Sequence, residues 1–442
     1  MSYKPYPVYK DSGIEWLGKI PEGWNLSPLF VILPEHYVQN IGMQSSDVLS
    51  LSYGEIIQKD VSDNFGLLPE SFETYQLVSP DDIILRLTDL QNDQRSLRTA
   101  ISSFSGIITS AYIKLRCYQN SSYFHWLLYS ADIQKVFYGL GGGVRQSIKY
   151  VDLKRFTLVV PPLPTQKAIA AFLDAKTARI DSLVRDYEEL IVLLSEKRQA
   201  LVSHAVTRGL SELVSPDDPD FGEWARPVAF KDSGVEWLGE IPEEWGVNKS
   251  RRLFAQRKER AEQSDEMITA SQKYGMIFQR EFMELEDQKV VQVLKDFDIL
   301  KKVKRNDFVM SMRSFQGGLE LSRIEGCMSS AYIALIPSSE INVEYYKWLF
   351  KCGRYIQGLQ STTNLVRDGQ ALRYDNFVKL ELPLLSQSEQ KAIAAYLDRE
   401  TAKLDALVAE AEGAIELLKE RRSALITAAV TGKINVEEIE VV

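Results

Sequence analysis

The chain is an internal duplication, and this feature constrains its fold more than any other. Residues 10–24 read KDSGIEWLGKIPEGW, and residues 231–245 read KDSGVEWLGEIPEEW, so only three of fifteen positions differ. The shift of 221 residues is half of the 442-residue chain. Solenoid repeats have a far shorter period, about 20–50 residues. We therefore expect two similar globular domains in series.

Three further pairs of segments follow in the same order. Tyr53-Gly54 returns as Tyr274-Gly275, and the four residues SAYI at 110–113 return at 330–333. The longest match is QKAIAAFLD at 166–174 with QKAIAAYLD at 390–398. Between these segments the two copies diverge. The two domains should therefore share a common backbone fold, while many of the side chains between the repeated segments differ.

Each half ends in a long apolar stripe that predicts a coiled-coil helix. Consecutive prolines at 161, 162 and 164 stop the preceding structure, and Thr165 is the expected helix cap. The first stripe contains Ile180, Leu183, Val184, Tyr187, Leu190, Ile191, Leu194 and Leu201. The second, after Pro383 and Ser386, contains Leu404, Leu407, Val408, Ile415, Leu418 and Leu425. A helix over 166–204 is roughly 60 Å long, longer than a small domain is wide, so the two helices should pair, most simply antiparallel.

The globular parts mix strand and helix patterns. Strands are expected at 82–85, 156–160 and 307–310, and amphipathic helices at 123–137 and 343–356. The fold class is therefore α+β, with two similar globular domains separated by two long antiparallel coiled-coil helices. The expected boundaries are a first domain at 1–163, a first helix at 164–210, an acidic linker at 211–227, a second domain at 228–387 and a second helix at 388–435.

Composition narrows the function. Three widely spaced cysteines suit a reducing compartment, and residues 1–12 have no apolar signal region, which favours a cytoplasmic protein that does not cross a membrane. The net charge of −9 argues mildly against nucleic-acid binding. Basic residues nevertheless cluster locally, and a local binding face remains open. They are Lys249, Arg251, Arg252, Arg257, Lys258 and Arg260, followed by Lys301, Lys302, Lys304 and Arg305.

Motifs of catalysis are weak. Residues 137–141 spell F-x-G-x-G, as in adenine methyltransferases, but a helix pattern precedes them, and the acidic residue and N/D-P-P-aromatic segment of such a site do not follow. Asp287 and Lys289 form a D-x-K string without an upstream Pro-Asp. The histidines at 36, 125 and 204 are far apart, which favours neither a metal site nor a catalytic triad. We expect no enzymatic activity and no metal or cofactor of its own.

The repeated D-S-G-x-E-W-L-G-x-I-P-E-x-W openings, the SAYI segments and the QKAIAA(F/Y)LD helix starts resemble the specificity subunit of type I restriction-modification systems. The resemblance covers nearly the whole chain. It implies that each globular part is a target recognition domain for one half of a split DNA sequence. It implies that the two helices set the spacing and dock methyltransferase subunits, with restriction translocase subunits as further partners. Adenosylmethionine, ATP and Mg would then belong to those partners. Because the two halves differ, the target should be bipartite and asymmetric.

Three groups of polar residues are candidates for contact with double-stranded DNA, since Arg suits guanine and Asn or Gln suits adenine. The first group is Arg86, Thr88, Gln91 and Asn92, matched by Ser311, Arg313, Ser314 and Gln316, with Gly317-Gly318 permitting close approach. The second is Ser50, Ser52, Tyr53 and Lys59, matched by Ser271, Gln272, Lys273, Tyr274 and Arg280. The third is Arg145, Gln146 and Ser147, matched by Asn364, Arg367 and Gln370. The basic clusters would contact phosphates.

The repeated tryptophans are interpreted as structural. Trp16 and Trp24 recur as Trp237 and Trp245, whereas residues that read different bases should differ between the copies. We expect them to clamp each domain's opening turn onto its core. Two other functions stay open: a coiled-coil scaffold that binds only protein, which the acidic charge favours, and a self-contained methyltransferase or nuclease, against which the missing motifs argue.

Overall fold

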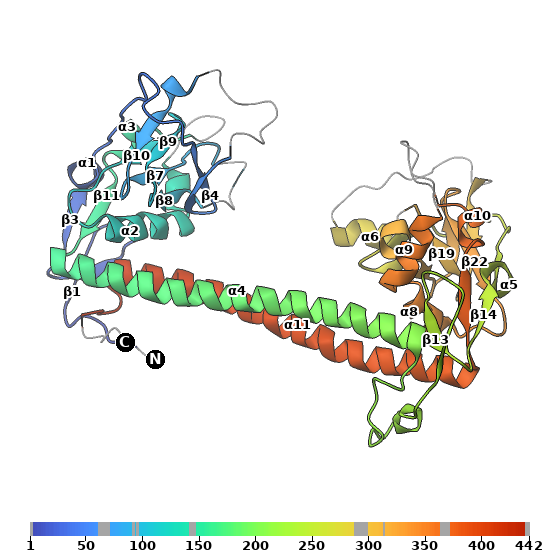
Figure 1. Ribbon diagram of the computed structural model, residues 1–442. Helices are drawn as coiled ribbons and strands as arrows, with labels where there is room; N and C mark the ends of the chain where they lie inside the picture. The colour runs from blue at the N-terminus through green and yellow to red at the C-terminus, as the bar shows by residue number, and fades with distance from the viewer. Residues whose placement is uncertain are drawn as a thin grey trace. The chain divides into compact units, whose positions relative to one another are not determined.

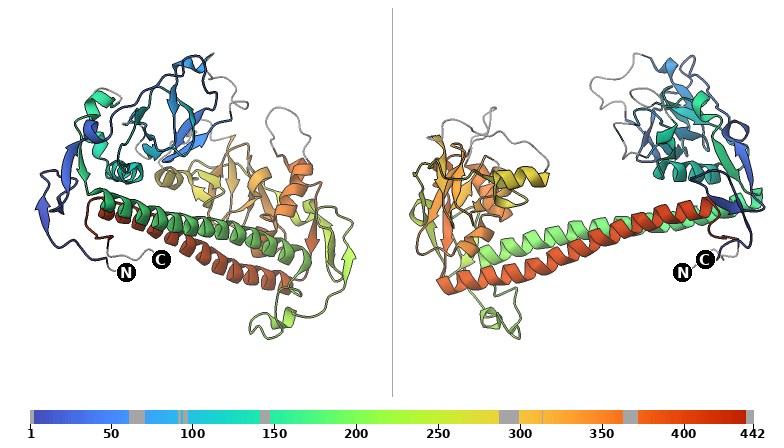
Figure 2. Two further views of the ribbon diagram at one scale, coloured as in Figure 1. Left: turned by 60° about the vertical axis from the view of Figure 1, so that its left-hand side comes forward. Right: turned by 180° about the vertical axis from the view of Figure 1, so that it is seen from behind.

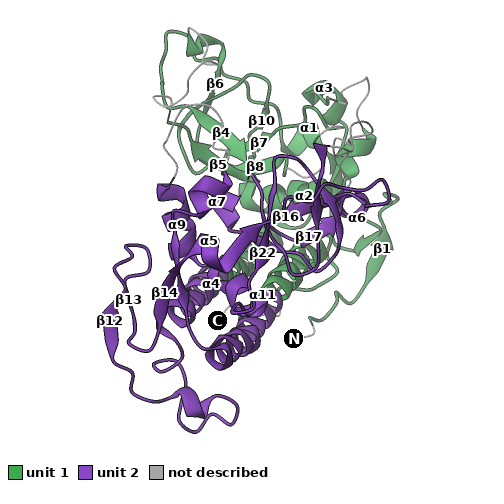
Figure 3. Cartoon of the chain, turned by 90° about the vertical axis from the view of Figure 1, so that its right-hand side faces the viewer, with its two compact units in different colours: residues 1–188, 412–442 green, residues 189–411 purple. Residues whose placement is uncertain are grey.

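The computed structural model describes residues 3–60, 71–90, 93, 97–140, 147–286, 299–312, 314–362 and 372–437. It consists of two compact units (Figure 3). Unit 1 combines residues 1–188 with 412–442, and unit 2 is the continuous stretch 189–411. Each unit therefore contains one globular part, one segment of α4 (Leu163–Arg208) and one segment of α11 (Gln387–Val430). Figure 1 labels both helices, and the two further views of Figure 2 show them running in opposite directions.

The globular part of unit 1 is built from short antiparallel strands. β3 (Asn25–Pro28) pairs with β11 (Thr157–Val160), and β7 (Ile83–Leu85) lies between β8 (Thr99–Ile101) and β10 (Ile113–Leu115). Two further ladders join β4 (Leu49–Ser52) with β5 (Glu55–Gln58) and β6 (Gln76–Val78) with β9 (Gly106–Ile108). The opening ladder joins β1 (Tyr9–Asp11) with β2 (Lys19–Pro21).

Unit 2 repeats this plan. Its strands are β12 (Phe230–Asp232), β13 (Glu240–Pro242), β14 (Gly246–Lys249), β15 (Phe254–Gln256), β16 (Ile268–Ser271), β17 (Gly275–Phe278), β18 (Lys301–Val303), β19 (Phe308–Met310), β20 (Glu320–Leu321), β21 (Gly326–Met328), β22 (Ile333–Pro337) and β23 (Glu381–Leu384). β14 pairs with β23 as β3 pairs with β11, and β16 pairs with β17 as β4 pairs with β5. The fold class is confirmed as α+β, with two similar globular parts and two long helices.

The helices of the globular parts differ in detail from the two that were predicted. α2 (Ser121–Ile133) starts where the Asn120 side chain accepts a hydrogen bond from the Tyr123 amide at 2.8 Å, and every residue from 123 to 132 is buried. It is therefore a core helix and not an amphipathic one. The helix expected at 343–356 is two helices, α8 (Val343–Leu349) and α9 (Gly353–Ser361). The break falls at Cys352, whose backbone is extended (φ −66°, ψ 132°), whereas the Phe350 amide still donates to the Tyr346 carbonyl at 3.0 Å.

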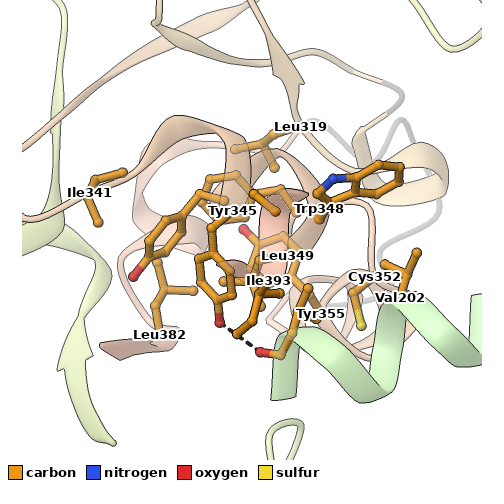
Figure 4. Packing of buried hydrophobic residues seen from close by; sticks show 14 of the residues in the cluster. Val202, Leu319, Ile341, Tyr345, Trp348, Leu349, Cys352, Tyr355, Leu382 and Ile393 are labelled. Carbon is orange, nitrogen blue, oxygen red and sulfur yellow. Dashed lines mark hydrogen bonds between the residues drawn. The ribbon is translucent and has the colours of Figure 1, made fainter. Parts of the chain in front are cut away.

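Each unit has its own hydrophobic core, completed by both long helices. In unit 1, Ile169 and Leu173 of α4 and Ile426 and Val430 of α11 are buried with α2. In unit 2 the corresponding layer contains Val202 of α4 and Ile393 of α11, packed with Tyr345, Leu349 and Cys352 (Figure 4). The remaining short helices are α1 (Leu29–Ile32), α3 (Tyr150–Leu153), α5 (Ser250–Leu253), α6 (Gln279–Glu286), α7 (Ser314–Gly317) and α10 (Tyr374–Phe377).

Two details of the coiled-coil prediction are wrong. Leu183, Leu190 and Leu407 are exposed, because each precedes a seam residue and neighbours on a helix point about 100° apart. Thr165 does not cap α4, since the helix already begins at Leu163, and its hydroxyl hydrogen-bonds Glu437. Ser386 does cap α11 by accepting a hydrogen bond from the Glu389 amide at 3.2 Å.

The tryptophans have the structural role that was expected. Trp24 and Trp245 are 2% and 1% exposed, and each packs at the glycine that ends a long helix. Gly432 lies against Trp24 and Pro21, and Gly209 lies against Trp245.

Candidate nucleic-acid interface

The β4–β5 hairpin, called the first hairpin, carries four of the predicted DNA-binding residues. Ser52 pairs with Glu55, which leaves Tyr53 and Gly54 as a two-residue turn with φ of +47° and +85°. The Tyr53 side chain is 84% exposed, and Lys59 is exposed just after β5. Ser50 and Ser52 are half-buried on β4. Of this group, Tyr53 and Lys59 are the side chains most available for contact.

The β16–β17 hairpin, called the second hairpin, has a turn that is one residue longer. Ser271 pairs with Gly275, so Gln272, Lys273 and Tyr274 form the turn. The Ser271 hydroxyl accepts hydrogen bonds from the Lys273 and Tyr274 amides at 3.2 and 3.3 Å, which gives it a structural task. Gln272 and Lys273 are exposed. The Tyr274 hydroxyl instead donates to Glu286 of α6 at 2.8 Å, which draws its ring back onto the domain.

A cleft of about 230 Å³ in unit 2 joins two of the predicted groups. It is lined by Ser271, Gln272 and Lys273 of the second hairpin and by Ser311, Gly318 and Glu320, with Glu286 and Phe282 of α6. Burial raises the pKa of Glu320, whose carboxylate is paired with Lys351. The cleft therefore combines apolar and polar surface, and its charged side chains are already paired within the protein.

The segments after β7 and β19 include residues that are not available as predicted. Ser314 is buried and accepts a hydrogen bond from the Ser311 amide at 2.9 Å, so its hydroxyl serves the start of α7. The Gly317-Gly318 pair allows close packing against other residues of the protein itself, and this space is not available to a ligand. A side chain at Gly318 would overlap the Phe350 carbonyl, and one at Gly317 would meet Gln272. Gln316 is exposed, and Arg86 and Thr88 are half-buried.

Of the remaining predicted DNA-contacting residues, two lie in the described part of the chain and the others lie outside it. Arg280 on α6 is 76% exposed and lies 3.6 Å from Glu266. Ser147 accepts a hydrogen bond from the Asp89 amide at 3.4 Å. The positions outside the described residues are Gln91, Asn92, Arg145, Gln146, Arg313, Asn364, Arg367 and Gln370, together with Asp287 and Lys289 of the D-x-K string.

Part of the predicted phosphate-binding cluster is already paired within the protein. Arg257 is 8% exposed and donates to Asp307 at 2.5 and 2.8 Å. Lys302 and Lys304 each lie 2.7 Å from a glutamate, and Lys301 donates to the Tyr332 carbonyl at 2.7 Å. Arg257, Lys302 and Lys304 thus neutralise local carboxylates and Lys301 is bonded to a backbone carbonyl, so all four are poor phosphate ligands. Within the predicted clusters, the exposed basic residues without an ion pair to another described residue are Lys249, Arg251, Arg252, Lys258, Arg260 and Arg305, of which Arg260 donates to the Ile299 carbonyl at 3.0 Å.

A junction between each globular part and the helices escaped the sequence analysis. In unit 1 the Trp126 indole donates to Asp174 of α4 at 2.7 Å, and Arg422 of α11 lies 2.9 Å from Asp181. Unit 2 repeats it with exchanged helices. The Trp348 indole donates to Asp398 of α11 at 3.0 Å, and Arg198 of α4 lies 3.1 Å from Asp405. A constant spacing of 224 residues between these aspartates and arginines is the signal that could have found it.

A groove of about 940 Å³ in unit 1 connects the first hairpin with this junction. Its lining includes Tyr53, Ile57 and Phe104 of the globular part and Asp181 and Arg422 of the long helices. His125 also lines it, and burial together with the Arg422 charge lowers the pKa of that imidazole to about 3. The groove therefore has a mixed lining, with apolar and polar residues from the globular part and charged residues from the helices.

Two features that the sequence analysis considered for catalysis can be compared with the structure. The F-x-G-x-G stretch is not a turn between a strand and a helix, since Val136–Gly139 is a 3-10 helix that follows α2 and buries Phe137. Among the residues with described positions, no three His, Cys, Asp or Glu side chains gather as metal ligands. None of the described helices is long and apolar enough to cross a membrane.

Comparison with known proteins gives consistent results. The family described as "Type I restriction modification DNA specificity domain" matches residues 98–190. The EcoKI specificity subunit of Escherichia coli is 24% identical over 212 residues, which are 44% of this chain and 45% of that protein. A putative MjaX specificity subunit of Methanocaldococcus jannaschii is 23% identical over 298 residues, 66% of this chain and 63% of that protein. The matched regions thus span less than two thirds of either relative.

Solved structures share the fold. A chain from a study of complex assembly and conformational transition of the type I R-M system superposes with a TM-score of 0.63 at 14% identity, covering 93% of this chain and 98% of that one. The HsdS subunit from Thermoanaerobacter tengcongensis gives a TM-score of 0.50 at 14% identity, covering 96% and 100%.

Proposed function

We propose that this chain is a specificity subunit of a type I restriction-modification system, the subunit that reads the DNA sequence for a methylation and restriction complex. It would read a bipartite, asymmetric target and carry out no reaction itself. The observation that carries this proposal is the contrast between constant and variable parts. The same Trp-Asp and Arg-Asp junction recurs in both units, while the two hairpins differ in turn length and in the side chains they present.

This contrast suits two DNA-recognition domains that are attached to the long helices in the same way but contact different bases. A hairpin of two strands fits the major groove of B-DNA, where each base pair presents its own pattern of donors and acceptors. The first hairpin would present Tyr53 and the second Gln272 and Lys273. Identical readers would favour a palindrome, so unlike readers favour an asymmetric target.

The long helices would dock methyltransferase subunits, which in turn recruit restriction subunits. Several large apolar side chains of α4 and α11 are at least 41% exposed, and these are the side chains that a docked subunit would cover. They are Leu183, Leu190, Val192, Leu193, Leu407 and Leu417. Adenosylmethionine, ATP and Mg²⁺ would be bound by those partners, and the assembly would work in the cytoplasm.

The experiment is methyladenine mapping across the genome of a host without other methylases. This chain is co-expressed with its neighbouring methyltransferase gene, and the control omits this chain. We expect a split, asymmetric motif that disappears in the control. Methylation that is independent of this chain would contradict the proposal.

A protein-binding scaffold is the rival that the net charge of −9 favours. Salt dependence of duplex binding separates the two functions, because binding that releases counterions weakens steeply with salt. We expect the complex to bind its mapped target and to lose affinity between low and high salt. A complex that assembles normally yet leaves duplex DNA unbound at low salt would favour the scaffold.

A further inference from the structure

The turn of the first hairpin has a backbone that its sequence does not favour. Two-residue turns with positive φ at both positions are type I′, which strongly prefer Asn, Asp or Gly. Tyr53 is held at φ +47°, a conformation that a bulky L-residue adopts only at a cost in conformational free energy. A tyrosine at this position therefore needs an explanation other than the stability of the turn.

The rest of the turn is braced, so the tyrosine is presented in a fixed way. A side chain at Gly54 would lie 3.0 Å from Leu97 and 3.6 Å from the Tyr129 ring, which holds the turn close to the body of the domain. The Tyr53 ring itself is 84% exposed and has no ring stacking or side-chain hydrogen bond with another described residue. Packing within the described part of the chain does not compensate for its backbone cost.

The second hairpin shows that the Tyr-Gly pair does not require exposure. Tyr274 lies 6.3 Å from Phe282 between ring centroids, and its hydroxyl donates to Glu286. Gln272 and Lys273 occupy the exposed end of that turn. The same dipeptide thus packs inward in one copy and projects in the other.

We propose that Tyr53 is the base-contacting side chain of the first hairpin and that its ring contacts the 5-methyl group of a thymine in the major groove. This inference rests on the proposed function and names the chemistry of one half-site. An aromatic ring offers an apolar edge to the methyl group, which is the feature that distinguishes thymine in that groove. The second hairpin would instead read by hydrogen bonds from the exposed Gln272 amide, since the Lys273 ammonium already lies 3.0 Å from Glu286.

The test uses the full chain in complex with its methyltransferase subunits and the target found by methylation mapping. Exchange of residues 1–163 first identifies which half-site belongs to the first domain. Each thymine of that half-site is then replaced by deoxyuridine, which removes only the methyl group. We expect one replacement to weaken binding about fourfold, the worth of one buried methyl group.

Tyr53→Asn separates recognition from stability. Asn suits a type I′ turn, so the variant should melt at a higher temperature than the original protein and yet bind the first half-site more weakly. It should also be indifferent to the deoxyuridine replacement that matters to the original protein. Tyr53→Phe keeps the ring and should keep the preference for thymine.

Three results would overturn the inference. They are full affinity in Tyr53→Asn, a first half-site without thymine, and an equal response of both proteins to every deoxyuridine. If the original complex binds no duplex at all, the proposed function fails as well, so the two failures are distinguishable.

Discussion

The Arg422 guanidinium of α11 lies 2.9 Å from the Asp181 carboxylate of α4 and also donates to the Tyr129 hydroxyl at 2.7 Å. It stands over the Trp126 ring, 5.6 Å from its centroid. One arginine thus joins both long helices to the core helix of the first globular part. In unit 2, Arg198 of α4 stands 5.4 Å from the Trp348 ring and contacts Asp405. Each globular part is therefore held by an arginine that the other copy's helix supplies.

Replacing Arg422 should lower the stability of unit 1 and leave that of unit 2 unchanged. Arg422→Met removes the pair with Asp181 and the bond to Tyr129, and we expect unit 1 to lose about 1–2 kcal/mol, since Asp181 is partly exposed to solvent. Hydrogen exchange measured separately over both units checks this. Arg421→Met, at the exposed neighbouring position, is the matched control.

Arg198→Met is the mirror experiment, and it should loosen unit 2 and spare unit 1. Equal exchange of both units in both variants would show that the junction does not act locally.

The glycines that end the long helices should differ in their tolerance of a methyl group. Both have positive φ, +79° at Gly209 and +72° at Gly432. A Cβ at Gly432 would lie 2.4 Å from Pro21, whereas at Gly209 the nearest atom is 3.4 Å away. We expect Gly209→Ala to cost about 1–2 kcal/mol for the backbone alone, and Gly432→Ala about 2–4 kcal/mol because of the added overlap. Chemical denaturation of the two variants checks the order, and the reverse order would contradict this packing.

His125 should make unit 1 sensitive to acid. Burial, with a smaller effect of Arg422, lowers its pKa to about 3, while the unfolded chain has the ordinary value of about 6.5. The stabilising contribution is complete above pH 6.5 and is lost as the pH falls toward 3, because the unfolded state binds the proton first. Between pH 7 and pH 5 the loss is about 2 kcal/mol.

Comparison with His125→Leu isolates this contribution. Burial raises the pKa of Asp132 to about 6, which acts in the opposite direction over the same range, so the original protein alone would not resolve the histidine. The variant should lose less stability than the original protein between pH 7 and pH 5. Parallel pH profiles would exclude His125 as the source.

The spacing between half-sites should follow the length of the helices. Seven residues inserted after Glu188 in α4, with seven more after Ala411 in α11, extend both helices where the two units meet in sequence. A whole heptad keeps the apolar seam in phase. Methylation mapping should then give a longer spacer between unchanged half-sites. An unchanged spacer would mean that the helices do not set it.

The repeated frame was predictable because identical segments carry packing information. The recurrence of Trp24 as Trp245 predicted a structural role for both residues. In the structure, each packs against the glycine that ends a long helix. The break between α8 and α9 was not predictable, because both helices pack into one core and the apolar pattern continues across the extended backbone of Cys352. Polar residues were harder still. Ser314 and Ser271 have the composition of base-contacting residues, yet their hydroxyls satisfy nearby backbone amides.

The division of the units along the chain has a consequence for synthesis on the ribosome. Unit 2 is continuous and is complete once residue 411 has emerged. Unit 1 is not, because Ile426, Ala429 and Val430 belong to its core and the Tyr123 hydroxyl donates to the Val430 carbonyl at 3.3 Å. The globular part made first must therefore wait, with the face of α2 that these residues cover still open to solvent. Domains usually fold in the order in which they are made. Here the first to be translated is the last to close, and a chaperone has that interval in which to bind it.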